Sequence, residues 1–106
     1  MTRAEFAAQL QTAVDRVFFD HADLGTKVPF VTYTWDYDNF PADNKAYKRI
    51  AVVTVTHYHA DYSKGEELKR VFDENDLFWN CTSAYDTDGK LYIDTYTMEV
   101  LEDGQS

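Results

Sequence analysis

Near the start of the chain, apolar side chains recur every three or four positions. This spacing predicts a helix from about Arg3 to Phe18, because such positions fall on one face of a helix. Thr2, followed three residues later by Glu5, predicts a capping box at the N-terminus of this helix. The apolar stripe consists of Phe6, Leu10, Ala13, Val14 and Val17.

After Pro29 the apolar pattern changes to a period of two, which is typical of β-strands. Residues 30–36 predict one strand, and residues 46–58 predict a second, longer strand. One face of this longer strand carries Ala51, Val53, Val55 and His57. The segment from Tyr37 to Lys45 is too long for a tight hairpin, so we expect a loop there.

A short apolar stripe of Leu68, Val71 and Phe72 predicts a second helix over about residues 64–75. Residues 77–84 and 90–101 predict a β-hairpin, because Asp88-Gly89 lies in the turn between two strand-like runs. The expected fold class is α+β: an antiparallel β-sheet with two helices packed on one face, in the order α-β-β-α-β-β. We expect residues 1–101 to form a single domain and residues 102–106 to be a flexible C-terminal tail.

The composition is that of one globular domain, with 106 residues of which 44% are hydrophobic. The single Cys81 excludes an intramolecular disulfide. No apolar run approaches the roughly 18–20 residues needed to cross a bilayer, and the N-terminus lacks the apolar core of a signal peptide. We therefore expect a protein that remains in the cytoplasm where it is made, without contact with a membrane.

Charge is strongly acidic and unevenly distributed along the chain. There are 10 Lys and Arg against 19 Asp and Glu, a net charge of −9, which argues against nonspecific binding to a phosphate backbone. Residues 72–106 contain nine acidic residues and only one basic residue, Lys90. The acidity is therefore concentrated on the predicted closing hairpin and the segment that leads into it.

One motif suggests metal chemistry. His57-x-His59-x-Asp61 resembles the H-x-H-x-D signature of metallo-β-lactamase-fold hydrolases, in which imidazoles and a carboxylate bind metal. The downstream ligands of that family are missing, Tyr62 replaces its usual next histidine, and its fold needs about twice this length. No glycine-rich phosphate loop or nucleophile elbow is present either. We expect no enzyme, no catalytic residue, no metal site and no cofactor, with the histidines in a structural or surface role and a small metal-dependent hydrolase as the least favoured alternative.

Residues 30–47 carry a second resemblance. Phe30-Val31-x-Tyr33-x-Trp35 is followed by Asn39 and then by Phe40-x-Ala42-Asp43-Asn44-Lys45-x-Tyr47. This stretch, with the long strand, Glu66-Glu67-Leu68-Lys69-Arg70 and Lys90-Leu91-Tyr92, resembles the tail terminator or tail completion proteins of phages and prophages with long non-contractile tails. The likeness extends over nearly the whole chain, and it departs from the family at residues 57–65.

The resemblance implies a structural virion subunit without catalysis. Its members form a ring, usually hexameric, that caps the head-proximal end of the tail tube, stops tail polymerisation and joins the tail to the head connector. The expected partners are other copies of the chain, the tail tube protein and the head–tail connector proteins. The expected interface is Tyr37, Asn39, Phe40, Asp43, Asn44, Lys45 and Tyr47, since aromatic anchors often carry interface energy; alternatively, Phe40 packs back under its own loop.

In such a ring, acidic side chains that line the channel would let DNA pass without binding tightly, because like charges repel. The candidates for this lumen-facing surface are Asp86, Asp88, Asp94 and Glu99. The alternative is a solvated hairpin that only keeps the subunit soluble. A different class of function is also open, a small acidic inhibitor or DNA mimic that binds a basic protein. Self-association distinguishes the two classes, since a mimic would be a monomer or dimer.

Overall fold

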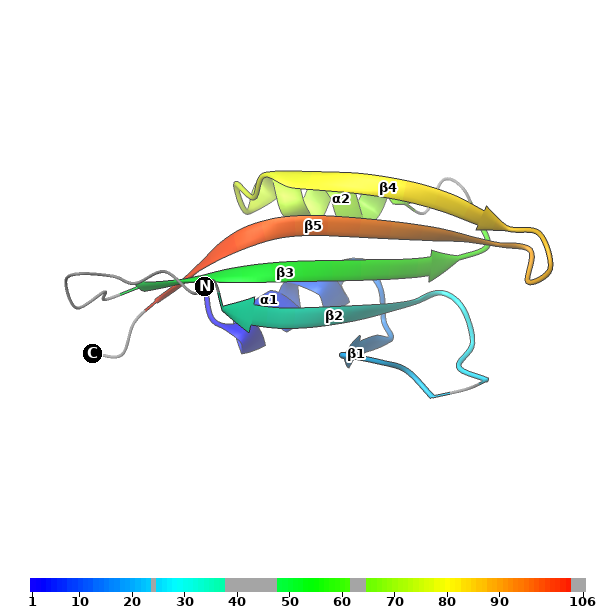
Figure 1. Cartoon of the computed structure of the whole chain (residues 1–106), viewed down its shortest axis with the longest axis horizontal. Helices are drawn as coiled ribbons and strands as arrows, with labels where there is room; N and C mark the ends of the chain where they lie inside the picture. Colours follow the sequence, from blue (N-terminus) through cyan, green and yellow to red (C-terminus); the bar gives the residue numbers. More distant parts are fainter. Residues whose placement is uncertain (24, 38–47, 62–64, 104–106) are drawn as a thin grey trace.

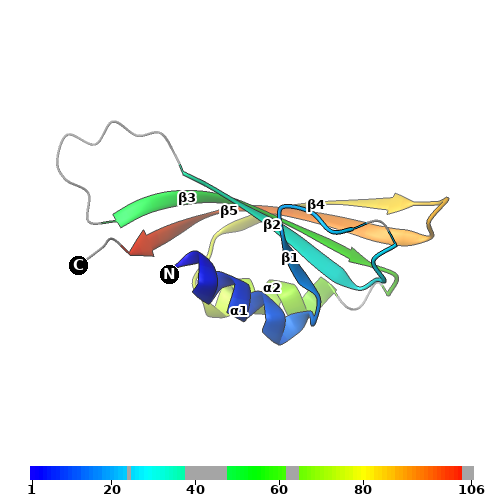
Figure 2. The ribbon, with the colours of Figure 1, turned by 90° about the horizontal axis from the view of Figure 1, so that it is seen from below.

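The computed structural model describes residues 1–23, 25–37, 48–61 and 65–103. Within them, five strands form one sheet in the order β1-β2-β3-β5-β4, and both helices lie on the same side of it (Figures 1 and 2). The molecule is elongated, with extents of 50 × 26 × 21 Å. The elements are α1 (Arg3–Ala13), β1 (Val17–Phe19), β2 (Phe30–Tyr37), β3 (Lys48–His59), α2 (Gly65–Glu74), β4 (Trp79–Asp86) and β5 (Leu91–Asp103).

The start of the chain differs from the expected fold. The first helix ends at Ala13, not Phe18, and Val14 has an extended backbone (φ −134°, ψ 125°). Residues 17–19 instead form β1, which pairs in parallel with β2 through Val17↔Val31 and Phe19↔Tyr33. The β-branched and aromatic side chains of β1 favour an extended backbone, and this pairing covers part of the free edge of β2. The order is therefore α-β-β-β-α-β-β, with one more strand than predicted. The predicted strands β2, β3, β5 and β4 pair antiparallel, but the parallel β1 makes the sheet mixed, so the prediction of a wholly antiparallel sheet was wrong.

The centre of the sheet is the pairing of β3 with β5, which runs from Lys48↔Asp103 to His59↔Tyr92. β5 lies between β3 and β4, so the closing hairpin joins the sheet through its second strand (Figure 1). This strand continues through Glu102 and Asp103, two residues that we assigned to the tail. The α+β class and the two-helix layer on one face agree with the sequence analysis.

Alternate residues of the central strands point to the helix side of the sheet, called here the inner face. Phe6 and Leu10 of α1, with Leu68 and Phe72 of α2, pack on it and are at most 1% exposed. None of the helices in the described ranges is long and apolar enough to cross a membrane. The inner-face residues in the core are Val31, Tyr33, Trp35, Ala51, Val53, Val55, Tyr96, Met98 and Val100.

The predicted capping box is present at the start of α1. The Thr2 hydroxyl accepts a hydrogen bond from the Glu5 amide at 3.2 Å, and the Glu5 carboxylate accepts one from the Thr2 amide at 2.8 Å. We expect Thr2→Ala to lower the free energy of unfolding by about 1 kcal/mol, because the first turn loses its side-chain acceptor. Urea unfolding measures this change. Thr2→Ser keeps the acceptor and should behave like wild type, so equal losses in both variants would contradict the assignment.

Candidate functional site

Most of the predicted interface loop lies outside the described residues. This applies to Asn39, Phe40, Asp43, Asn44, Lys45 and Tyr47. Tyr37 is described: it is the last residue of β2 and its side chain is 48% exposed. The loop prediction therefore stays a prediction.

The four acidic candidates for a channel lining do not share one surface. Asp86 and Asp88 are exposed around the β4–β5 turn, where the Asp86 carboxylate accepts a hydrogen bond from the Asp88 amide at 3.1 Å. Glu99 is exposed on the opposite side of the sheet from the helices. Asp94 is buried, with 7% exposure, because it lies on the inner face of β5 together with Tyr96. The expectation that Asp94 belongs to an exposed acidic surface was wrong.

The face of the sheet away from the helices, called here the outer face, carries an array of threonines. A Thr-x-Thr pair occurs on each of β2, β3 and β5, and the strand register aligns the pairs: Thr34↔Thr54↔Thr97 and Thr32↔Thr56↔Thr95. Asn80 and Thr82 of β4 extend the two rows. All eight side chains are partly or fully exposed. The repeated Thr-x-Thr pattern is visible in the sequence, but only the register of the strands aligns the three pairs.

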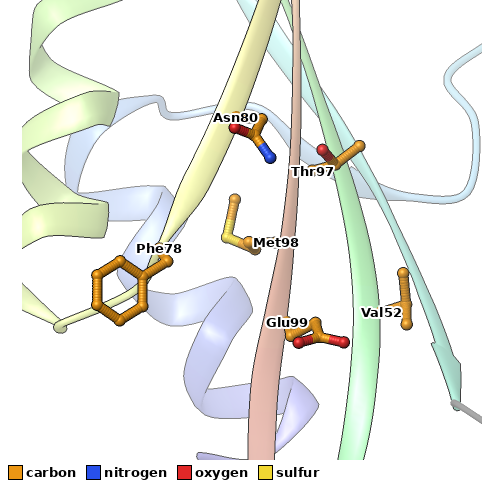
Figure 3. Close-up of a pocket in the computed structure, with 6 residues that line it drawn as sticks. All are labelled: Val52, Phe78, Asn80, Thr97, Met98 and Glu99. Atoms are coloured by element: carbon orange, nitrogen blue, oxygen red, sulfur yellow. The ribbon is translucent and has the colours of Figure 1, made fainter.

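A shallow hollow lies at the end of these rows (Figure 3). Figure 3 shows Phe78 at one margin and Val52 and Thr97 toward the other. The Phe78 side chain is 94% exposed, and Val52 is 39% exposed. The hollow therefore has an exposed apolar side chain at each margin. The outer face thus combines uncharged polar rows with an apolar margin.

The second feature is a buried cluster of two histidines and an aspartate on the inner face of the sheet. His57 and His59 both point to the inner face, at 1% and 2% exposure, and their rings stack with centroids 4.3 Å apart. His59 Nε2 lies 2.7 Å from Asp94 Oδ2, and His59 Nδ1 lies 2.8 Å from the backbone carbonyl oxygen of Asp61. Both ring nitrogens of His59 therefore face acceptors, and they donate to both when the ring is protonated.

The carboxylate that completes this cluster differs from the one in the sequence motif. His57, His59 and Asp94 each place a potential ligand atom within 4.8 Å of the other two. Asp61 instead supplies its backbone oxygen to His59. Asp94 reaches the histidines because β5 pairs with β3 in the register His57↔Asp94. The H-x-H part of the motif therefore identifies two members of the cluster, while its Asp61 does not.

The pKa values of His57 and Asp94 are both lowered in the folded chain. Burial, together with the positive charge of neighbouring His59, lowers the pKa of His57 to about 4, although Asp94 opposes this change. Burial alone would raise the pKa of Asp94, but hydrogen bonds from Ser83 and His59 outweigh it and lower that pKa. At neutral pH, a neutral His57 therefore lies beside the ionised carboxylate of Asp94.

His57 has no hydrogen-bond partner for either ring nitrogen among the described residues. A small pocket of about 60 Å³ opens beside the cluster. Gly65, the first residue of α2, keeps this space free, since a Cβ there would lie 3.2 Å from Asp94 Oδ2. The pocket is lined by His59, Gly65, Glu66, Lys69, Ser83, Tyr92 and Asp94.

No protein-family model matches the chain, and no curated protein matches it. Two features of the described residues bear on function: the rows of uncharged side chains on the outer face and the buried cluster of His57, His59 and Asp94.

Proposed function

We propose that the chain is a structural subunit that assembles with copies of itself, through the outer face of its sheet, into the ring that terminates a phage tail. The phage role rests on the resemblance at residues 30–47. The observation that supports self-assembly is the array of uncharged side chains that crosses β2, β3, β5 and β4. The ring would cap the tube, contact the tail tube protein and the head–tail connector, and become part of the virion.

The net charge explains why this face is the favoured contact. Each copy carries a net charge of −9, so two copies repel one another over most of their surfaces. The threonine rows place no carboxylate between the copies, and their methyl groups add apolar contact area. Asp36 and Glu99 are both in register with Val52, and they form the next row along the strands, beside the threonine rows. A second copy is therefore the occupant that we assign to this face.

The exposed carboxylates at the β4–β5 turn would face the channel of the proposed ring. Asp86 and Asp88 lie at the far end of the β4–β5 hairpin, which is one end of the elongated subunit (Figure 1). If the hairpin ends point toward the axis of a ring, these carboxylates repel the phosphates of passing DNA. Glu99 lies two residues beyond Thr97 on β5, away from the hairpin end, and is left out of the proposed channel lining.

The test is the mass of the assembled protein. We expect light scattering of the purified chain, alone or mixed with the tail tube protein of the same phage, to give a mass about six times that of one chain. Negative-stain images should show rings, or tubes that stop at a cap. Thr97→Glu introduces a carboxylate in the middle of the outer face and should reduce ring formation at least tenfold.

Gln11→Glu is the matched control, because it adds the same charge on an exposed position of α1. It should assemble like wild type. A wild-type chain that remains a monomer, both alone and with the tube protein, would contradict the proposal and favour the acidic-inhibitor class. Unchanged assembly of Thr97→Glu would exclude the outer face as the contact.

A further inference from the structure

We infer that His57, His59 and Asp94 form a binding site for one divalent transition-metal ion of the zinc type. The inference comes from the buried cluster alone and does not depend on the proposed ring. Two imidazoles and one carboxylate are a ligand set that zinc and its neighbours accept. The three residues lie on two adjacent strands, so the sheet itself holds their backbones in place.

The distances are close to those of a metal site. Two bonds of about 2.1 Å from one ion allow its ligand atoms to be at most about 4.2 Å apart. The ligand atoms here lie within 4.8 Å of one another. Small rotations of the side chains therefore bring all three atoms within range, without movement of the paired strands. The ion would lie between His59 Nε2 and Asp94 Oδ2, which are 2.7 Å apart.

His57 is the residue that most needs a partner. Its imidazole is 1% exposed, and neither of its nitrogens has a hydrogen-bond partner among the described residues. A buried polar group without a partner is unfavourable, so such groups are rare unless something else binds them. Its neutral form carries the free electron pair that a metal ion binds. A metal ion satisfies one nitrogen of His57 directly.

His59 is already oriented as a metal ligand. Its Nδ1 donates to the Asp61 carbonyl oxygen, which leaves Nε2 pointing at Asp94. Metal-binding histidines usually donate their second nitrogen to an oxygen in this way, and the contact fixes the ring.

The adjoining pocket supplies room for the remaining ligand. Its volume of about 60 Å³ accommodates a water molecule, and Gly65 leaves the space beside Asp94 open. The other charged groups at this pocket are Glu66 and Lys69 of α2. They form an ion pair in which Lys69 Nζ lies 3.5 Å from Glu66 Oε1. Asp94 supplies one negative charge against the divalent ion, because Lys69 balances the charge of Glu66. The site thus joins β3 and β5 beneath α2 and is suited to a structural role.

The experiment titrates the full chain, purified with chelator and then freed of it, with Zn²⁺ or Co²⁺ alone. We expect one ion per chain, the visible absorption bands of four-coordinate Co²⁺, and a rise in melting temperature.

His57→Phe and Asp94→Asn should each weaken Zn²⁺ binding by on the order of 100-fold or more, since loss of an outer partner alone costs about 10–100-fold. The control is His21→Ala, because His21 is exposed and pairs with Asp20 outside the cluster. It should bind as wild type does. Asp94→Asn keeps the shape of the side chain, so it decides the question if His57→Phe fails to fold by circular dichroism. Absence of stoichiometric binding in wild type, wild-type affinity in a folded cluster variant, or loss of binding in His21→Ala would each overturn the site.

Discussion

Phe6→Ala is expected to lower the free energy of unfolding by about 3–5 kcal/mol, the usual cost of removing a buried phenyl ring. Phe6 is 1% exposed and joins three elements: its ring lies 5.5 Å from Trp35, 6.0 Å from Tyr33 and 6.4 Å from Phe72, centroid to centroid. The surrounding rings come from β2 and α2, which cannot both move into the space left behind. Urea unfolding followed by fluorescence measures the change.

Gln11→Ala is the control for this experiment, since Gln11 lies on the exposed side of the same helix. Its effect should stay within about 0.5 kcal/mol. A loss below about 1 kcal/mol for Phe6→Ala would show that α1 does not pack on the sheet as described.

The second large effect is a loss of stability in acid for the metal-free protein. The pKa of His57 is about 4 in the folded chain and 6.5 in the unfolded chain. The unfolded state therefore binds the proton first as the pH falls below 6.5, and stability declines by about 1.4 kcal/mol per pH unit. We expect a loss of about 2 kcal/mol between pH 6.5 and pH 5, and about 3 kcal/mol by pH 4. Above pH 7 this group contributes no pH dependence.

His57→Phe removes the titrating group, so its stability should change much less over the same range. His21→Ala should retain the full wild-type slope, because His21 is exposed. Asp94 acts at lower pH: its pKa is lowered by folding, so its contribution is present at neutral pH and is lost as the pH falls toward and below 4. Parallel curves for wild type and His57→Phe between pH 6.5 and pH 5 would contradict this assignment.

Much of the sheet and the second helix could be predicted because each has a clear period. Alternation at residues 30–36 and 46–58 matches β2 and β3, and Leu68, Val71 and Phe72 mark the buried side of α2. The failure at β1 has a physical origin. Val14 and Val17 fit the stripe of a helix as well as they fit an extended chain, and a three-residue strand is too short to show alternation. Its pairing with β2 is a tertiary contact that decides the local conformation.

The candidate site could be predicted only in part, for a similar reason. His57 and His59 share a face of one strand, which alternation alone reveals. Asp94 lies 35 residues from His59 in the chain. Its place beside the pair depends on the register of β3 with β5, which no local pattern specifies. The burial of Asp94 could have been predicted from the sequence. Asp94 lies an even number of residues from Tyr96 and Met98, so all three point to the same face of the strand, whereas Glu99 points to the other face.

The two faces of β5 carry the residues of the two proposed roles of the molecule. Asp94, Tyr96, Met98 and Val100 point to the inner face and are buried, whereas Thr97, Glu99 and Leu101 are exposed on the outer face. The first set maintains the fold and the histidine cluster, and the second contacts whatever lies against the sheet. Substitutions at the inner positions therefore remove buried contacts, whereas substitutions at the outer positions alter only the exposed surface. The outer side of β5 can be redesigned without disturbing the core or the buried cluster.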